Sequence, residues 1–181
     1  MKRMLMLALA GFAAGATFAQ APTDPVDRAL IAAPDNMKKD ATVVKWKSDF
    51  TYDTLKKGTN RMVCYELSGF PTHPAFMAEC TSIANLDRVA QNLKFKAIPD
   101  KAASQKAFDD AEKGGTRVKP EFGSVWLHVM GADPEHTRKH VTVAVPGATA
   151  QSMNLPDNPR QGGIWIMGAG TSTAHLMIPG N

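Results

Sequence analysis

Hydrophobic and polar positions repeat along part of the chain with the period of a helix. Apolar residues recur at three- and four-residue spacings, which places them on one face of a helix. The segments with this pattern are 25–33, 86–93 and 102–113. Asp24 and Asn85 stand at the N-cap positions of the first two, and Gly114 follows the third. The pattern predicts two or three helices.

The other apolar segments are shorter and predict strands. They are rich in Val, Ile, Trp and Met, and Gly and Pro pairs separate the later ones. The expected strands are 42–47, 62–67, 76–83, 124–130, 140–145, 164–167 and 174–178. Helices in the middle of the chain with strands on both sides predict one α+β domain over residues 20–181, with a mainly antiparallel sheet. The pattern does not give the order of the strands.

Residues 1–19 have the three parts of a secretory signal peptide. Lys2 and Arg3 form the charged start, residues 4–12 form the apolar middle, and small residues lead to a cleavage site after Ala19. The apolar part is shorter than the roughly 20 residues that a retained membrane anchor needs. No cysteine lies there to carry a lipid. We therefore expect a secreted or periplasmic protein with no transmembrane segment in the mature chain.

The charge of the chain changes once this segment is removed. The chain has 21 Lys and Arg against 17 Asp and Glu, a net charge of +4. Without Lys2 and Arg3, 19 basic residues remain against 17 acidic ones, a net charge of +2. The remaining lysines are scattered, whereas nucleic-acid binding requires cations gathered on one face. We expect no nucleic-acid partner.

Cys64 and Cys80 are the only cysteines of the chain. An even number in an oxidising compartment predicts a disulfide. The turn-rich segment 68–74 allows the flanking strands to lie side by side, and closing this loop is worth about 3 kcal/mol. The alternatives are a redox pair, which usually has a much shorter spacing, and a Cys/His metal site that includes His73.

A repeated His-x-Met pattern is the most suggestive candidate chemistry. His128 and Met130 lie in one predicted strand, and His175 and Met177 lie in another. Residues two apart in a strand point to the same face, so each strand offers an imidazole and a thioether together. This pair suits Cu(I), and His140 begins a third strand that can join them. Alternatively, the methionines fill the core and the histidines only satisfy hydrogen bonds.

Two further patterns resemble known catalytic motifs but lack required parts. His136 and His140 are four residues apart, as zinc ligands on a helix are, but Thr137 replaces the glutamate of that motif and His140 belongs to a strand. Segment 170–174 resembles a nucleophile elbow, but no helix follows it. Trp165 is a candidate for the wall of a ligand pocket.

Several short segments together resemble an uncharacterised family of small secreted bacterial proteins. They are Gly58-Thr59-Asn60, Cys64, Cys80, His140, residues 162–167, Gly170-Thr171, residues 174–177 and Pro179. The chain departs from the family pattern after Asn60, where Arg61-Met62-Val63 replaces a usual aromatic residue. The resemblance implies that the disulfide and the C-terminal strand pair belong to one fold, and it implies no activity.

Three functions follow as hypotheses. The first is an exported binding protein for a transition metal such as copper, or for a small molecule. Its candidate ligands are His128, Met130, His140, His175 and Met177. The second is a secreted enzyme with His175 or His140 as general base in a pocket roofed by Trp165, which requires a carboxylate beside one of these histidines. The third is a structural or partner-binding envelope protein, which predicts an exposed apolar patch.

Overall fold

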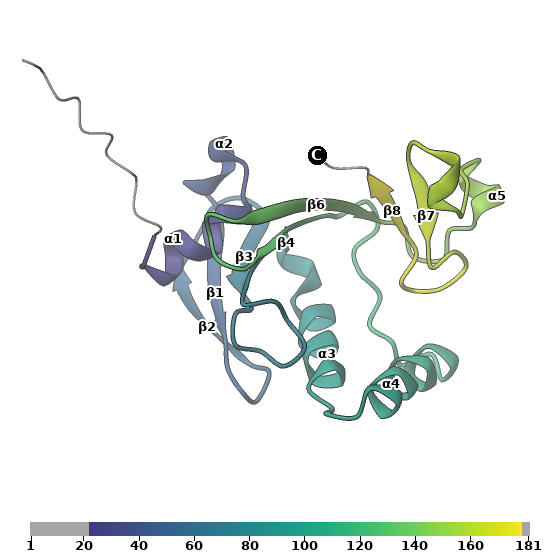
Figure 1. The fold of residues 1–181 in the computed structure, drawn as a ribbon, viewed down its shortest axis with the longest axis horizontal. Helices are drawn as coiled ribbons and strands as arrows, with labels where there is room; N and C mark the ends of the chain where they lie inside the picture. Colours follow the sequence, from purple (N-terminus) through teal and green to yellow (C-terminus); the bar gives the residue numbers. More distant parts are fainter. Residues whose placement is uncertain (1–21, 179–181) are drawn as a thin grey trace, which may run out of the picture.

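The computed structural model describes residues 22–178, which form one mixed sheet with helices on both faces (Figure 1). Its strands are β1 (Thr42–Trp46), β2 (Tyr52–Lys56), β3 (Met62–Glu66), β4 (Phe76–Ser82), β5 (Val125–Gly131), β6 (Thr137–Ala144), β7 (Trp165–Met167) and β8 (His175–Ile178). Their order across the sheet is β2-β1-β3-β4-β5-β6-β8-β7. Only β1 and β3 pair in parallel. The predicted α+β fold with a mainly antiparallel sheet is confirmed.

The helices outnumber the two or three that the sequence predicts. Residues 22–178 contain α1 (Pro25–Ala29), α2 (Asp35–Lys38), α3 (Leu86–Lys96), α4 (Lys101–Lys113) and α5 (Ala150–Met153), with short 3₁₀ turns at Leu30–Ala32, Ile83–Asn85 and Pro159–Gln161. The predicted number was wrong because α2 and α5 have four residues each, which is too short for a helical period to show.

Two strands differ from the prediction for physical reasons. The sequence did not predict β2, which is an edge strand whose first four residues are exposed, so it has no alternating apolar face. β6 begins at Thr137 and not at His140, because polar residues continue the ladder with β5. His140 therefore lies inside a strand, directly opposite His128.

One face of the sheet is covered by α1 and the 3₁₀ turn after it. Asp24 accepts hydrogen bonds from the first backbone amides of α1, as its N-cap position predicts. The core on this face contains Ala78, Val129 and the predicted disulfide. Cys64 and Cys80 face each other across β3 and β4 with a Cα–Cα distance of 4.1 Å, which confirms the pair. The core on this face is apolar.

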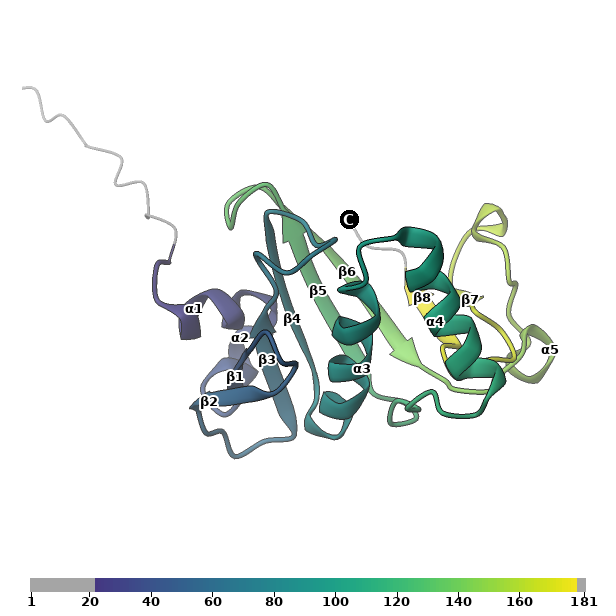
Figure 2. The ribbon, with the colours of Figure 1, turned by 90° about the horizontal axis from the view of Figure 1, so that it is seen from below.

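The opposite face is covered by α3, which Figure 2 shows lying across the sheet with α4 beside it. Leu86, Val89 and Leu93 repeat at helical spacing and pack on the sheet, while Phe95 contacts Phe108 of α4 edge to face at 5.1 Å. Packing on this side therefore holds α3 over the strands and α4 against α3.

Asn85 stands at the N-cap position of α3, but its side chain does not cap the helix. Its amide nitrogen donates to the hydroxyl groups of Thr81 and Ser124, and its amide oxygen accepts from the backbone of Glu121. The capping role predicted for Asn85 was wrong, because this fully buried amide ties the start of α3 to the sheet.

The predicted signal peptide, residues 1–19, lies outside the described residues. Between residues 22 and 178, no helix has the length and apolar character needed to cross a bilayer.

Candidate functional site

The strand order brings together three histidines that the sequence alone could not place. β5, β6 and β8 are consecutive neighbours in the sheet. His128 lies directly opposite His140, and His175 lies opposite Ala144, four residues after His140 along β6. Because four residues are two periods of a strand, all three imidazoles lie on the face covered by α3.

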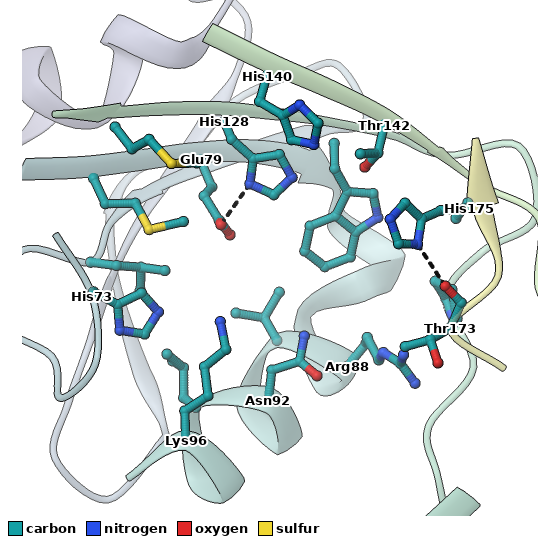
Figure 3. A pocket seen from close by; sticks show the side chains of 18 of the residues that line it. His73, Glu79, Arg88, Asn92, Lys96, His128, His140, Thr142, Thr173 and His175 are labelled. Atoms are coloured by element: carbon teal, nitrogen blue, oxygen red, sulfur yellow. Dashed lines mark hydrogen bonds and ion pairs between the residues drawn. The ribbon is translucent and has the colours of Figure 1, made fainter. Parts of the chain in front are cut away.

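A cavity of about 340 Å³ lies between this face and α3, and we call it the histidine pocket (Figure 3). Its polar wall includes His73, Glu79, His128, His140 and His175. Its apolar wall includes Leu67, Met77, Val89, Leu93, Trp126 and Met130. Met177 and Trp165 pair with each other across β8 and β7 and are not among the residues that line the pocket. The aromatic wall is formed by Trp126, whose ring stacks on His128 with an interplanar angle of 15°.

Glu79 is buried at the base of the pocket and is bonded to His128. One carboxylate oxygen lies 2.7 Å from Nδ1 of His128, and the other accepts from the hydroxyl of Tyr65 at 2.9 Å. The sequence analysis did not select Glu79, although a lone carboxylate inside an otherwise buried apolar strand is a readable signal.

The state of this carboxylate follows from its neighbours. Burial favours the neutral acid, but the hydrogen bond from His128 and the charge of Lys96 favour the anion, and the pKa of Glu79 lies below its ordinary value. Burial and the nearby carboxylate raise the pKa of the Tyr65 hydroxyl, which remains a donor. An ionised Glu79 only accepts hydrogen bonds, so Nδ1 of His128 carries the proton. In the neutral imidazole, Nε2 then keeps a free lone pair.

His140 and His175 extend the row of imidazoles. The rings of His128 and His140 are 5.6 Å apart between centroids. Burial, followed by the charges that His128 and His175 can carry, lowers the pKa of His140. Nδ1 of His175 lies 2.7 Å from the carbonyl oxygen of Thr173, so this nitrogen is the donor and Nε2 is the free position.

His73 closes the opposite end of the pocket. Its Nδ1 donates to the carbonyl oxygen of Pro71 at 2.9 Å. Burial and the charge of Lys96 lower the pKa of His73, which favours the neutral ring. Its Nε2 is then a buried acceptor, and it has no hydrogen-bond partner among residues 22–178. Thr72, directly before it, has a left-handed φ of 66°, which is costly for a β-branched residue.

The histidines do not form an imidazole–carboxylate metal centre. Within the described part of the chain, no group of three or more His, Cys, Asp or Glu side chains is arranged to hold a metal ion. Nδ1 of His128 and Nδ1 of His175 are engaged with Glu79 and Thr173, and Met177 is not part of the pocket lining. The pocket presents its imidazoles as separate hydrogen-bonding groups.

α3 contributes a row of polar side chains that the sequence analysis also did not select. Arg88, Asn92 and Lys96 are spaced by four residues and all line the pocket. Side chains at this spacing lie on one face of a helix, so the row was readable from the sequence. Figure 3 shows Asn92 and Lys96 rising from α3 toward the strands, whereas Arg88 extends toward Thr173.

Comparisons of the chain with protein-family models, with curated proteins and with solved structures find no match.

Proposed function

We propose that the protein binds a small organic molecule in the histidine pocket. The observation that carries this proposal is a cavity of about 340 Å³ with an apolar wall and inward-facing polar atoms. Small-molecule sites commonly have this size and combine apolar walls with a few converging polar groups.

The walls of the pocket suit a planar organic ligand. Trp126 offers a flat ring and Met77 and Met130 offer adaptable apolar surface, so the pocket can surround a planar molecule.

The proposal is tested by screening fragments against the mature protein by NMR. Binding fragments should shift the imidazole signals of His128, His140 and His175 together. Thr173 is an exposed residue at the edge of the pocket, so Thr173→Phe should narrow its entrance and weaken binding about tenfold or more.

Thr54→Phe is the matched control, because Thr54 is an exposed threonine on β2 and does not line the pocket. It should leave fragment binding unchanged. Fragments that shift none of the three imidazoles, or that bind Thr173→Phe as well as the parent protein, would overturn the proposal.

A second candidate function is acid–base catalysis, and the Glu79–His128 pair favours it. The carboxylate fixes the proton on Nδ1 of His128 and orients the ring, which leaves Nε2 to accept a proton from a bound molecule. The enzyme hypothesis from the sequence required a carboxylate beside His175 or His140, and the structure instead places Glu79 beside His128. The base in this arrangement is His128, whereas the sequence had suggested His175 or His140.

The enzyme candidate is tested with p-nitrophenyl esters and phosphodiesters. An active site at His128 should give turnover that falls at least about a hundredfold in His128→Gln. If His128→Gln keeps the turnover of the parent protein, or if the parent protein has no turnover to lose, the enzyme candidate is wrong. The binding function would then remain as the only proposal.

We also propose that the protein works outside the cytoplasm, as residues 1–19 suggest. The disulfide between Cys64 and Cys80 supports this, because disulfides persist mainly in oxidising compartments.

A further inference from the structure

The row on α3 presents hydrogen-bond donors and no acceptors to the histidine pocket. The amide oxygen of Asn92 accepts a hydrogen bond from Arg117, so its amide nitrogen is directed into the pocket. Lys96 has only N–H donors. No hydrogen bond or ion pair within residues 22–178 engages the ammonium group of Lys96. The Cα positions of these two residues are about 6 Å apart along the helix, and Figure 3 shows both side chains rising into the pocket, so one acceptor group can meet both.

The charges around this row are not balanced. Among residues 22–178, Glu79 is the only acidic residue that lines the pocket, and its two oxygens already accept hydrogen bonds from Tyr65 and His128. Arg88 is almost completely buried, and it donates to the carbonyl of Val118 and the hydroxyl of Ser172.

Two more charged residues, Arg117 and Glu112, act on Arg88. Burial, with the charge of the neighbouring Arg117, lowers the pKa of Arg88 to about 10. The one carboxylate near both guanidinium groups is Glu112, which is bound to the backbone and hydroxyl of Ser172. Three cations, Arg88, Lys96 and Arg117, therefore stand against two carboxylates, and the pocket lacks one negative charge.

We infer that the ligand carries a carboxylate or phosphate group that binds the donors of Lys96 and Asn92, while its remaining part lies against Trp126. This inference rests on the proposed binding function and names its ligand class. A charge-assisted hydrogen bond is stronger than a neutral one, and an anion placed here also lies in the field of Arg88. A neutral ligand would leave the ammonium group of Lys96 without a hydrogen-bonded counter-ion in a partly dry cavity.

The inference is tested with pairs of probes that differ in charge and not in shape. The pairs are benzoate with benzamide, and phenyl phosphate with the neutral phenyl sulfamate, each titrated by NMR into the mature protein. The anions should bind about tenfold more tightly than their neutral partners at low salt, and the preference should shrink as salt is added.

Variants of α3 test whether Lys96 causes the preference for anionic probes. Lys96→Gln should remove most of the preference for anions, and Lys96→Arg should keep it. Lys94→Gln is the matched control, because Lys94 is exposed on the same helix and does not line the pocket. Circular dichroism checks that each variant is folded.

Each outcome has a separate meaning. Neutral probes that bind as tightly as anions, or an unchanged preference in folded Lys96→Gln, would overturn the inference and leave the binding function in place. Failure of both kinds of probe to shift the pocket imidazoles would overturn the binding function and the inference together.

Discussion

The two faces of the sheet are built from the same strands, yet they bury different kinds of side chain. On β4, Ala78 and Cys80 face α1, whereas Met77 and Glu79 face α3. On β5, Val129 faces α1, whereas His128 faces the pocket. Because successive residues of a strand point to opposite faces, neighbouring residues contribute either to an apolar core or to a polar pocket.

Along a single strand, residues that face α1 contribute mainly to stability, whereas residues that face α3 also carry the polar groups of the pocket. The α1 face is apolar and carries the disulfide, so its residues contribute through burial and chain constraint. The α3 face combines an apolar core near Tyr65 with the ionised Glu79 and the imidazoles. Substitutions on the first face should change only the free energy of unfolding, whereas those on the second should also change titration and binding.

The largest expected effect is the loss of the disulfide. The double variant Cys64→Ala with Cys80→Ala removes a constraint across a sequence separation of 16, which should lower the free energy of unfolding by about 3 kcal/mol. Urea unfolding measures this loss. The histidine titrations of the folded variant should match those of the parent protein, because the cysteines lie on the α1 face.

If removing the disulfide changed the histidine titrations, the two faces of the sheet would not be independent. A changed pKa of His140 in the folded double variant, or a loss below about 1 kcal/mol, would contradict the prediction. Reduction of the parent protein is a control that needs no substitution, and its unfolding curve should coincide with that of the double variant.

A smaller effect is expected for Glu79→Gln, which keeps the shape of the side chain and removes its charge. The hydrogen bonds from Tyr65 and His128 become neutral, so the free energy of unfolding should fall by about 2 kcal/mol at pH 7. Glu135→Gln is the matched control, because Glu135 is exposed and should give no measurable change.

The same variant should change the dependence of stability on pH. The pKa of Glu79 in the folded protein lies below its ordinary value of 4.5, so the unfolded chain binds the proton more readily. The stabilisation from this carboxylate is present above pH 4.5 and is lost as pH falls through the lower folded-state pKa. Acid unfolding should therefore be less steep in Glu79→Gln, and equally steep curves would contradict the account of this carboxylate.

The sequence predicted much of the fold because its long elements carry strong periods. The helical spacing of Val89 and Leu93 and the even pair of cysteines each give a local signal with one main interpretation. β2 has no buried face, and α2 and α5 have too few residues to show a period. These elements form because the rest of the fold positions them.

The pocket was less predictable because it depends on strand order. The sequence showed His128 and His175 in separate strands, but only the adjacency of β5, β6 and β8 brings them to one cavity. Glu79 could be noticed as a carboxylate in a buried strand, and Lys96 as part of a polar row on a helix. The residues that surround each of them in the pocket are distant in the sequence, so the pocket could not be predicted. Trp126 and Trp165 look alike in the sequence, and the sheet places only Trp126 among the pocket-lining residues.

The smallest expected effect compares two histidines that are four residues apart and lie in different surroundings. His136 is exposed and its Nδ1 lies 2.9 Å from the Asp133 carboxylate, which raises the pKa of His136 above its ordinary value of 6.5. His140 faces the pocket, where burial and then the charges of His128 and His175 lower its pKa below that value. An NMR titration of the imidazole signals should therefore show His140 losing its proton at a lower pH than His136.

Two substitutions then separate the causes of these shifts. Asp133→Asn should lower the pKa of His136 and leave that of His140 unchanged, because Asp133 is not a cause of the His140 shift. His128→Gln should raise the pKa of His140 only in part, because burial is the larger cause and remains. If the pKa of His140 stays below that of His136 in both variants, burial of His140 in the pocket is the main cause of the difference between the two pKa values. Equal pKa values in the parent protein would mean that the Asp133 contact and the pocket do not shift the two imidazoles in opposite directions, and the contrast between the two histidines would then be wrong.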